Sequence, residues 1–238
     1  MNQIKSTPRD VLMHLFSIIL LYVSAGSFIV LLFQLVNINF PDPLSYDYGP
    51  GNAIRWALAI LVIIFPVFLW ATRFLERDIK KAPEKADLKV RKWLLYFTLF
   101  AAAGFIIGDL VTLIFNFLEG DLTTRFLLKI LIVLLVAVGV FAYYLNNLRK
   151  KPGEVSSGIR SFVWVVIGLV AVSVVYGFFV AGSPFKQRLV RFDNQKVSHL
   201  TEIQYRVINY WTNKNKLPSS LDDLVNDIDG YRPAVDPQ

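Results

Sequence analysis

Five long apolar runs fill more than the first two thirds of the chain. They cover residues 11–36, 53–75, 93–118, 126–145 and 161–181. Each run holds about 20 or more mostly apolar residues, enough at about 1.5 Å rise per residue to cross a hydrocarbon layer about 30 Å thick. The mean hydropathy of +0.48 agrees, and 18% of charged residues is too small a share to cover a soluble domain of this length. The sequence therefore predicts an all-α membrane protein, a five-transmembrane-helix bundle with a small, mainly helical C-terminal module.

The composition changes sharply after the fifth run, at Gly182, Ser183 and Pro184. A serine followed by a proline is typical of an N-cap and the first position of a new helix. We therefore expect three parts: a four-helix transmembrane domain over residues 1–150, a connection and fifth transmembrane helix over 151–183, and a soluble helical module over 184–238.

Lysine and arginine are divided unequally between the connections. The amino-terminal segment and the second and fourth connections hold fourteen of them, whereas the first and third connections hold only Arg55 and Arg125. The positive-inside rule then places the amino terminus in the cytoplasm, and five crossings make the C-terminal module extracytoplasmic. Lys186, Arg188 and Arg191 closely follow the fifth run and favour the opposite placement, but the four earlier helices outweigh them.

An acidic residue interrupts the third apolar run. Asp109 lies well inside it, where an ionised carboxylate is costly unless it is paired, protonated or hydrated. Lys129 lies a few residues into the fourth run, and counting from the shared short connection puts both side chains on the order of 10 Å below that interface. We predict that they meet. A buried salt bridge that sets helix register is favoured over an ion or proton site, because only one intramembrane acid is present.

Small residues recur on the same predicted helix. Ala101, Gly104 and Gly108 form a small-xxx-small pattern that allows helices to approach closely. We interpret the pattern as a packing face rather than a dimerisation motif.

The second connection is basic and has helical spacing. Glu76 with Lys80 and Asp87 with Arg91 are acid and base pairs four residues apart. Pro83 divides the segment and suits the first turn of a helix that continues into the third span. We interpret the charges as those of a solvated connection that sets the topology. We favour this interpretation over a binding site for anionic lipid headgroups.

The C-terminal module has an amphipathic pattern. Ile203, Val207 and Tyr210 recur at helical spacing and form an apolar face that needs a cover, which makes them the candidate partner-binding face. Leu217 and Pro218 end this helix. Ser220 and Asp223 then have the positions of an N-cap and a first-turn acid in a second, short helix.

This tail resembles the soluble half of type II secretion pseudopilins. The residues that carry the resemblance are Leu200, Ile203, Ile208, Tyr210, Trp211, Lys216, Leu217, Pro218, Ser220, Leu221, Leu224, Gly230, Tyr231, Asp236 and Pro237. The resemblance implies a shortened module, since the family's small antiparallel sheet would only be starting at Gln238. The fifth span also lacks that family's processing and assembly signal, so polymerisation into a pilus is not implied.

The first four spans, residues 11–148, resemble an uncharacterised bacterial multispan family known only as a domain of unknown function. Phe65, Pro66, Leu69, the 77–92 connection and the 93–109 helix carry the resemblance. It implies a bacterial inner-membrane or plasma-membrane protein and supplies neither a substrate nor a catalytic residue.

The residue types and their spacing argue against metal, calcium and nucleic-acid binding sites. Cysteine is absent, and the histidines, His14 and His199, fall on opposite sides of the predicted membrane, so they share no metal. The tail acids, Asp222, Asp223, Asp227, Asp229 and Asp236, do not have the spacing of an EF-hand loop and are interpreted as caps and a solvated face rather than a calcium site. The net charge of +7 gathers beside the spans, not on a nucleic-acid-binding face. We predict no enzyme activity, cofactor or metal.

Two functional hypotheses remain. The preferred one is a non-enzymatic membrane scaffold that displays its extracytoplasmic module to another envelope protein. The alternative is a small ion-coupled transporter centred on Asp109 and Lys129.

Overall fold

The computed structural model describes residues 7–41, 52–120, 122–149, 157–225 and 231–232. Its main helices are α1 (Pro8–Asn39), α2 (Asn52–Lys81), α3 (Lys89–Glu119), α4 (Thr124–Arg149), α5 (Ser157–Ala181) and α6 (Pro184–Lys214); two short 3₁₀ helices are η1 (Pro83–Asp87) and η2 (Leu221–Leu224). The chain divides into two compact units, residues 1–181 and 182–238. The all-α fold predicted from the sequence is confirmed.

Each of the five apolar runs lies within one of the helices α1 to α5, and all five helices are long and apolar enough to cross a membrane. The helices extend beyond the runs because polar residues continue the same backbone hydrogen bonding. Helix α2, for example, continues to Lys81. Pro83 begins the 3₁₀ helix η1 rather than the first turn of α3, which starts six residues later at Lys89. The prediction that Pro83 starts the third span's helix is therefore wrong.

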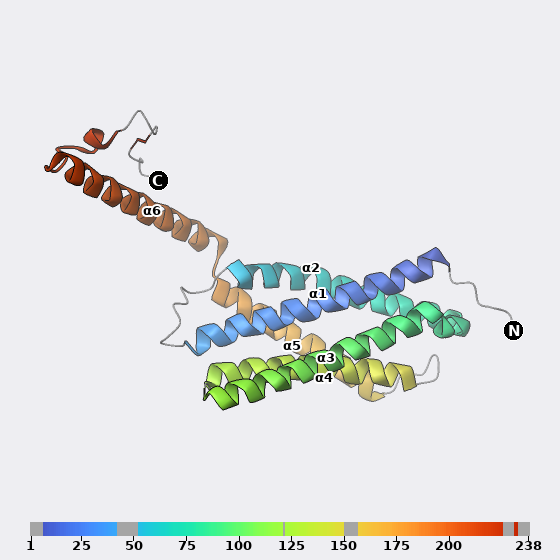
Figure 1. Ribbon diagram of the computed structural model, residues 1–238. Coiled ribbons are helices and arrows are strands. Elements are labelled where there is room, and N and C mark those ends of the chain that lie inside the picture. Colours follow the sequence, from blue (N-terminus) through green and yellow to red (C-terminus); the bar gives the residue numbers. More distant parts are fainter. Residues whose placement is uncertain (1–6, 42–51, 121, 150–156, 226–230, 233–238) are drawn as a thin grey trace. The chain divides into compact units, whose positions relative to one another are not determined.

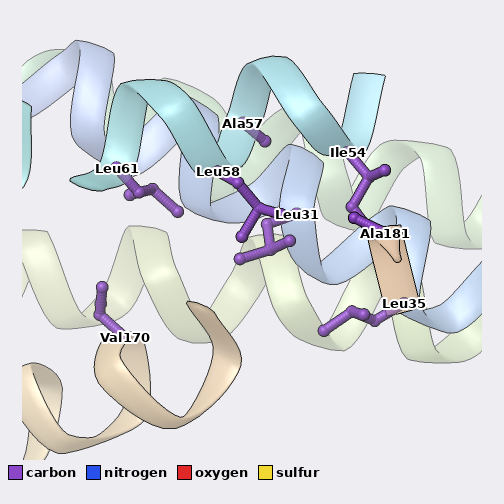
Figure 2. Close-up of a cluster of buried hydrophobic side chains, with 8 residues drawn as sticks. All are labelled: Leu31, Leu35, Ile54, Ala57, Leu58, Leu61, Val170 and Ala181. Atoms are coloured by element: carbon purple, nitrogen blue, oxygen red, sulfur yellow. The ribbon is translucent and has the colours of Figure 1, made fainter. Parts of the chain in front are cut away.

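Helix α1 is the centre of the first unit, where it contacts each of the helices α2 to α5. In Figure 1, α2 runs along one side of α1, and α3 and α4 lie together on another side. The C-terminal half of α1 places Leu31 and Leu35 in a buried cluster with residues of α2 and α5 (Figure 2). The N-terminal half places Ile18 and Leu21 in a second cluster with residues of α3 and α4. One helix therefore joins two separate cores.

Small side chains allow this central position. Ser17, Ser24 and Ser27 are buried on α1 together with its leucines. Small residues let neighbouring backbones approach closely, which strengthens packing between helices that are all surrounded by hydrocarbon.

The outside of the first unit is apolar. Phe100, Leu118 and Phe179 are each more than three quarters exposed, and four tryptophans, Trp56, Trp70, Trp93 and Trp164, are exposed as well. In water such a surface would be an extensive apolar patch, whereas in a bilayer it faces lipid. Contact with the lipid bilayer therefore follows from the exposed side chains as well as from helix length.

The glycines do not pack where the sequence suggested. Apart from the backbone of their own helix turn and the adjoining residues, no heavy atom lies within 4 Å of the Cβ position at Gly104 or Gly108, so the predicted close packing at these glycines is not found within the described chain. The close approach is instead at Gly177 of α5. A Cβ atom there would lie 2.8 Å from Cδ2 of Leu58 and 3.0 Å from Cδ1 of Leu31. Figure 2 shows these two leucines pointing toward each other in the core between α1 and α2.

The second unit folds around α6. Asn215, at φ 49°, has the left-handed conformation that ends α6, and its backbone N–H donates to the carbonyl of Trp211. The helix therefore ends before Asn215, which is two residues before the predicted end at Leu217. After the connection, the Asp223 carboxylate accepts hydrogen bonds from the backbone N–H groups of Ser219 and Ser220, which confirms the predicted cap. The short helix is 3₁₀. Gly230, Asp236 and Pro237, which belong to the pseudopilin resemblance, lie outside the described residues, as do Asp227 and Asp229.

The close packing at Gly177 predicts a position-specific loss of stability. Gly177→Val is expected to lower the free energy of unfolding by about 1 to 3 kcal/mol, because the added atoms overpack the leucines of α1 and α2. Gly168→Val on the same helix is the control, since the space around its Cβ position is open. Denaturation in detergent micelles measures both, and equal effects of the two substitutions would contradict the packing.

Candidate functional site

The predicted intramembrane acid faces the interior of the bundle. Asp109 is 8% exposed, whereas its neighbours Ile107 and Leu110 are exposed. It continues the buried face of α3 that includes Leu95, Thr98 and Ala102, at steps of three, four and seven residues. The carboxylate oxygen Oδ2 is buried and has no hydrogen-bond partner among the described residues. Such a group is costly to bury, so its position is the most unusual polar feature of the spans.

Other polar side chains on α3 satisfy themselves on their own helix. The hydroxyls of Thr98 and Thr112 donate to the carbonyls of Leu94 and Gly108, and the Asn116 amide donates to the carbonyl of Thr112. Bonding to the carbonyl four residues earlier is the usual way for these side chains to be accommodated in hydrocarbon. A carboxylate has no donor and cannot use this solution, which separates Asp109 from the others.

The proposed partner of Asp109 has a contact with a different helix. Lys129 is half-buried on α4, and its ammonium lies 5.6 Å from the ring centroid of Phe33 on α1. A cation over an aromatic face is a favourable interaction in a dry environment. Lys129 therefore connects α4 to the central helix, and its ion pair with Asp109 stays a prediction.

At the end of the bundle where α1 begins, a polar network that the sequence did not predict connects α1, α2 and η1. The Lys85 ammonium of η1 lies 3.0 Å from Oδ1 of Asp10 on α1 and 2.6 Å from Oδ2 of Asp78 on α2. Asp10 is buried, although it is in the first turn of its helix. Thr7 is the N-cap of α1, and its hydroxyl donates to the Asp10 carboxylate over 2.8 Å. One lysine thus binds the start of α1 to the end of α2.

Charge and hydrogen bonding stabilise the ionised form of Lys85. Its hydrogen bond to Asp78 is the largest cause that raises the pKa of Lys85 above the ordinary value of 10.5, followed by its hydrogen bond to Asp10. Asp87 and Arg91, which the sequence predicts to pair, each have a further contact, and their own pairing stays a prediction. Asp87 pairs with Lys92 over 2.7 Å, which lowers the pKa of that carboxyl, and Arg91 donates to Asn147 on α4.

Asparagines at the opposite end of α1 fasten it to α4 and α5. The guanidinium of Arg125 donates from Nε to the Asn37 side chain over 2.8 Å, and the Tyr176 hydroxyl donates to Asn39 over 3.1 Å. Together with the Lys85 network, these bonds hold both ends of the central helix.

The predicted partner-binding face of the tail is partly covered by its own chain. Ile203, Val207 and Tyr210 are half-buried on α6. On the same helix, the Arg206 guanidinium stacks 4.2 Å from the ring centroid of Tyr231, and both Tyr231 and Leu224 are buried. Leu200 and Trp211, seven residues before and four residues after Val207, are exposed at the edge of this face.

Within the described ranges, no group of three or more histidine, cysteine or acidic side chains is arranged to hold a metal ion. His14 is half-buried on α1, and His199 is half-buried on α6 in the other unit.

The fold and the apolar surface define a multi-pass helical membrane protein. A family model described as a domain of unknown function, DUF5671, matches residues 10–144, and the chain belongs to this family. The matched segment holds all of α2 and α3 and most of α1 and α4. No curated protein and no solved structure matches the chain.

The resemblance of the first four spans to a multispan family of unknown function is confirmed at that level. Its bacterial origin, and the resemblance of the tail to pseudopilins, stay predictions.

Removing the charge of Lys85 tests the N-terminal network. Lys85→Gln is expected to destabilise the protein by about 1 to 3 kcal/mol, because the buried Asp10 loses its charged donor. Since the pKa of Lys85 is raised, its contribution is complete below pH 10.5 and is lost at higher pH. Unfolding of both proteins across this pH range measures the difference.

The exposed Lys92 is the control for this measurement, because a pair in contact with water contributes little. If Lys85→Gln and Lys92→Gln had the same small effect, the network would have no structural role.

Proposed function

We propose that the protein is a non-enzymatic membrane scaffold whose C-terminal module binds another protein of the cell envelope. The observation that supports this most is the surface of α6, where Leu200 is 65%, Ile208 52% and Trp211 54% exposed. Leu200 and Trp211 are separated by about three whole helical turns, and Ile208 lies within about 80° of both around the helix, so the three side chains share one broad side of α6. A module that exposes an aliphatic and aromatic stripe to water resembles the centre of a protein interface.

The two faces of α6 have different roles in this proposal. The half-buried face with Ile203, Val207 and Tyr210 contributes to the module's own packing, together with Leu224 and Tyr231. The neighbouring face with Leu200, Ile208 and Trp211 receives the partner. The resemblance of the tail to pseudopilin soluble halves supports a protein-binding role. The distribution of lysine and arginine supports a cytoplasmic amino terminus and an extracytoplasmic module in a bacterial inner or plasma membrane.

Removing the C-terminal module, or placing a charge on the exposed face of α6, tests the proposed scaffold function. We expect the intact protein to retain envelope partners that residues 1–183 and the Ile208→Glu variant lose, because a buried charge opposes an apolar contact. Gln195→Glu adds the same charge on the opposite side of α6 and is expected to keep the partners. Affinity capture after cross-linking in intact cells measures this. Recovery of the same partners with residues 1–183 would contradict the proposal.

A second function is favoured by one observation, the buried Oδ2 atom of Asp109 without a partner among the described residues. In this alternative, the protein is a small ion-coupled carrier in which Asp109 binds the ion or proton and Lys129 tunes the site. The preferred scaffold role instead makes Asp109 and Lys129 structural.

Flux measurements separate the two functions. In vesicles that contain the purified protein, a carrier is expected to move protons or alkali cations down an imposed gradient, and Asp109→Asn is expected to remove that flux. Thr112→Val, one turn away on α3, is the control. If the vesicles showed no flux, or a flux that Asp109→Asn left unchanged, the carrier function would be excluded.

A further inference from the structure

A groove runs between the central helix and α2 on the surface of the bundle. Its volume is about 370 Å³, and its lining includes Tyr22, Gly26 and Val30 from α1 and Ala53, Trp56 and Ile60 from α2. The lining is almost entirely apolar, and within the membrane its solvent is hydrocarbon.

The side chains explain the hollow shape. Gly26 and Ala53 have little or no side chain, while Tyr22 and Trp56 are large and stand beside them. No other part of the described chain places a heavy atom within 4 Å of the Cβ position of Gly26, apart from its own helix turn and the adjoining residues, so the space above this glycine is open. On the far side of α2, Leu58 and Leu61 are buried in the core, which keeps the two helices together below the groove.

The length of the groove is that of one leaflet. Eight residue steps from Tyr22 to Val30 cover about 12 Å, close to half of the roughly 30 Å hydrocarbon thickness. The groove also reaches the first turns of α2, where the 69% exposed Trp56 lies four residues after the helix start at Asn52. Tryptophan prefers the boundary between headgroups and hydrocarbon. The groove therefore extends from that boundary toward the middle of the membrane.

These dimensions favour a narrow occupant. A transmembrane helix is about 10 to 12 Å in diameter and about 30 Å long, and it packs along most of its length. A groove of this length and volume does not accommodate one. An acyl chain is narrow, follows the membrane normal and needs only apolar contacts.

We propose that this groove is a binding site for one acyl chain of a bilayer phospholipid, with Gly26 providing the space in which the chain lies. The site is independent of the scaffold role and of Asp109. It would bind the chain of a lipid from the leaflet at the end of the bundle where α1 ends and α2 begins.

Photocross-linking in lipid nanodiscs tests the site. The full-length protein is placed in phosphatidylcholine nanodiscs that contain a phosphatidylcholine analogue with a diazirine in one acyl chain. Light expels N₂ from the diazirine, and the carbene that remains inserts into a neighbouring C–H or O–H bond. Mass spectrometry then locates the adducts. We expect them to concentrate on residues 22–30 and 53–60, above the level on the exposed apolar residues of α5.

Filling the groove provides the sharper comparison. Gly26→Phe is expected to reduce the groove adducts by about tenfold, the change that corresponds to about 1.4 kcal/mol of binding. Gly104→Phe has equally open space around its Cβ position on α3 and is expected to leave them unchanged. Circular dichroism and thermal unfolding check that both variants fold. A second glycine variant, Gly26→Leu, replaces the phenylalanine if that variant fails to fold.

Each other result would overturn the proposal. Adducts spread evenly over all exposed apolar faces would mean ordinary solvation by lipid. Groove adducts that persist in folded Gly26→Phe or Gly26→Leu would place the chain elsewhere. A dimer that dissociates in these variants would identify a second copy of the protein as the occupant.

Discussion

The structure depends on the need to satisfy every backbone polar group within hydrocarbon, which leaves helices as the way for this chain to cross a bilayer. Five helices meet that need, and α1 organises them. Its two halves join separate apolar cores, Lys85 fastens its first turn to α2, and Asn37 and Asn39 fasten its last turns to α4 and α5. Helices in lipid gain little from leaving the solvent, so close packing and a few polar bonds determine their arrangement.

The sequence predicted those features that depend on local pattern. The five spans follow from apolar runs whose length matches the membrane, and the Asp223 cap follows from a motif of four residues. Features that depend on tertiary contacts were missed. Gly177 and Gly104 are both glycines in apolar helices, but Leu31 and Leu58 close only on Gly177. Likewise, the contact between Lys85 and Asp10, which are 75 residues apart, had no signal in the sequence.

The candidate sites show the same division. A carboxylate in an apolar run is conspicuous, and the structure places Asp109 in the interior, as a costly charge requires. The contact between the Lys129 ammonium and the Phe33 ring depends on the position of α1. The spacing of residues along α3 and α4 does not reveal that position. On α6, periodicity identified Ile203, Val207 and Tyr210 as apolar but did not show that they are half-buried. The groove at Gly26 is likewise a property of two helices together.

The five crossings can be tested most directly by labelling, because the chain has no cysteine of its own. Glu84→Cys lies in the exposed connection after the second span, and Ser219→Cys lies in the exposed tail after the fifth. Five crossings predict that, in sealed vesicles of one orientation, a membrane-impermeant maleimide labels only one of the two cysteines, and that detergent makes both accessible. Labelling of both, or of neither, before detergent would put the two sites on the same side and contradict the five-pass fold.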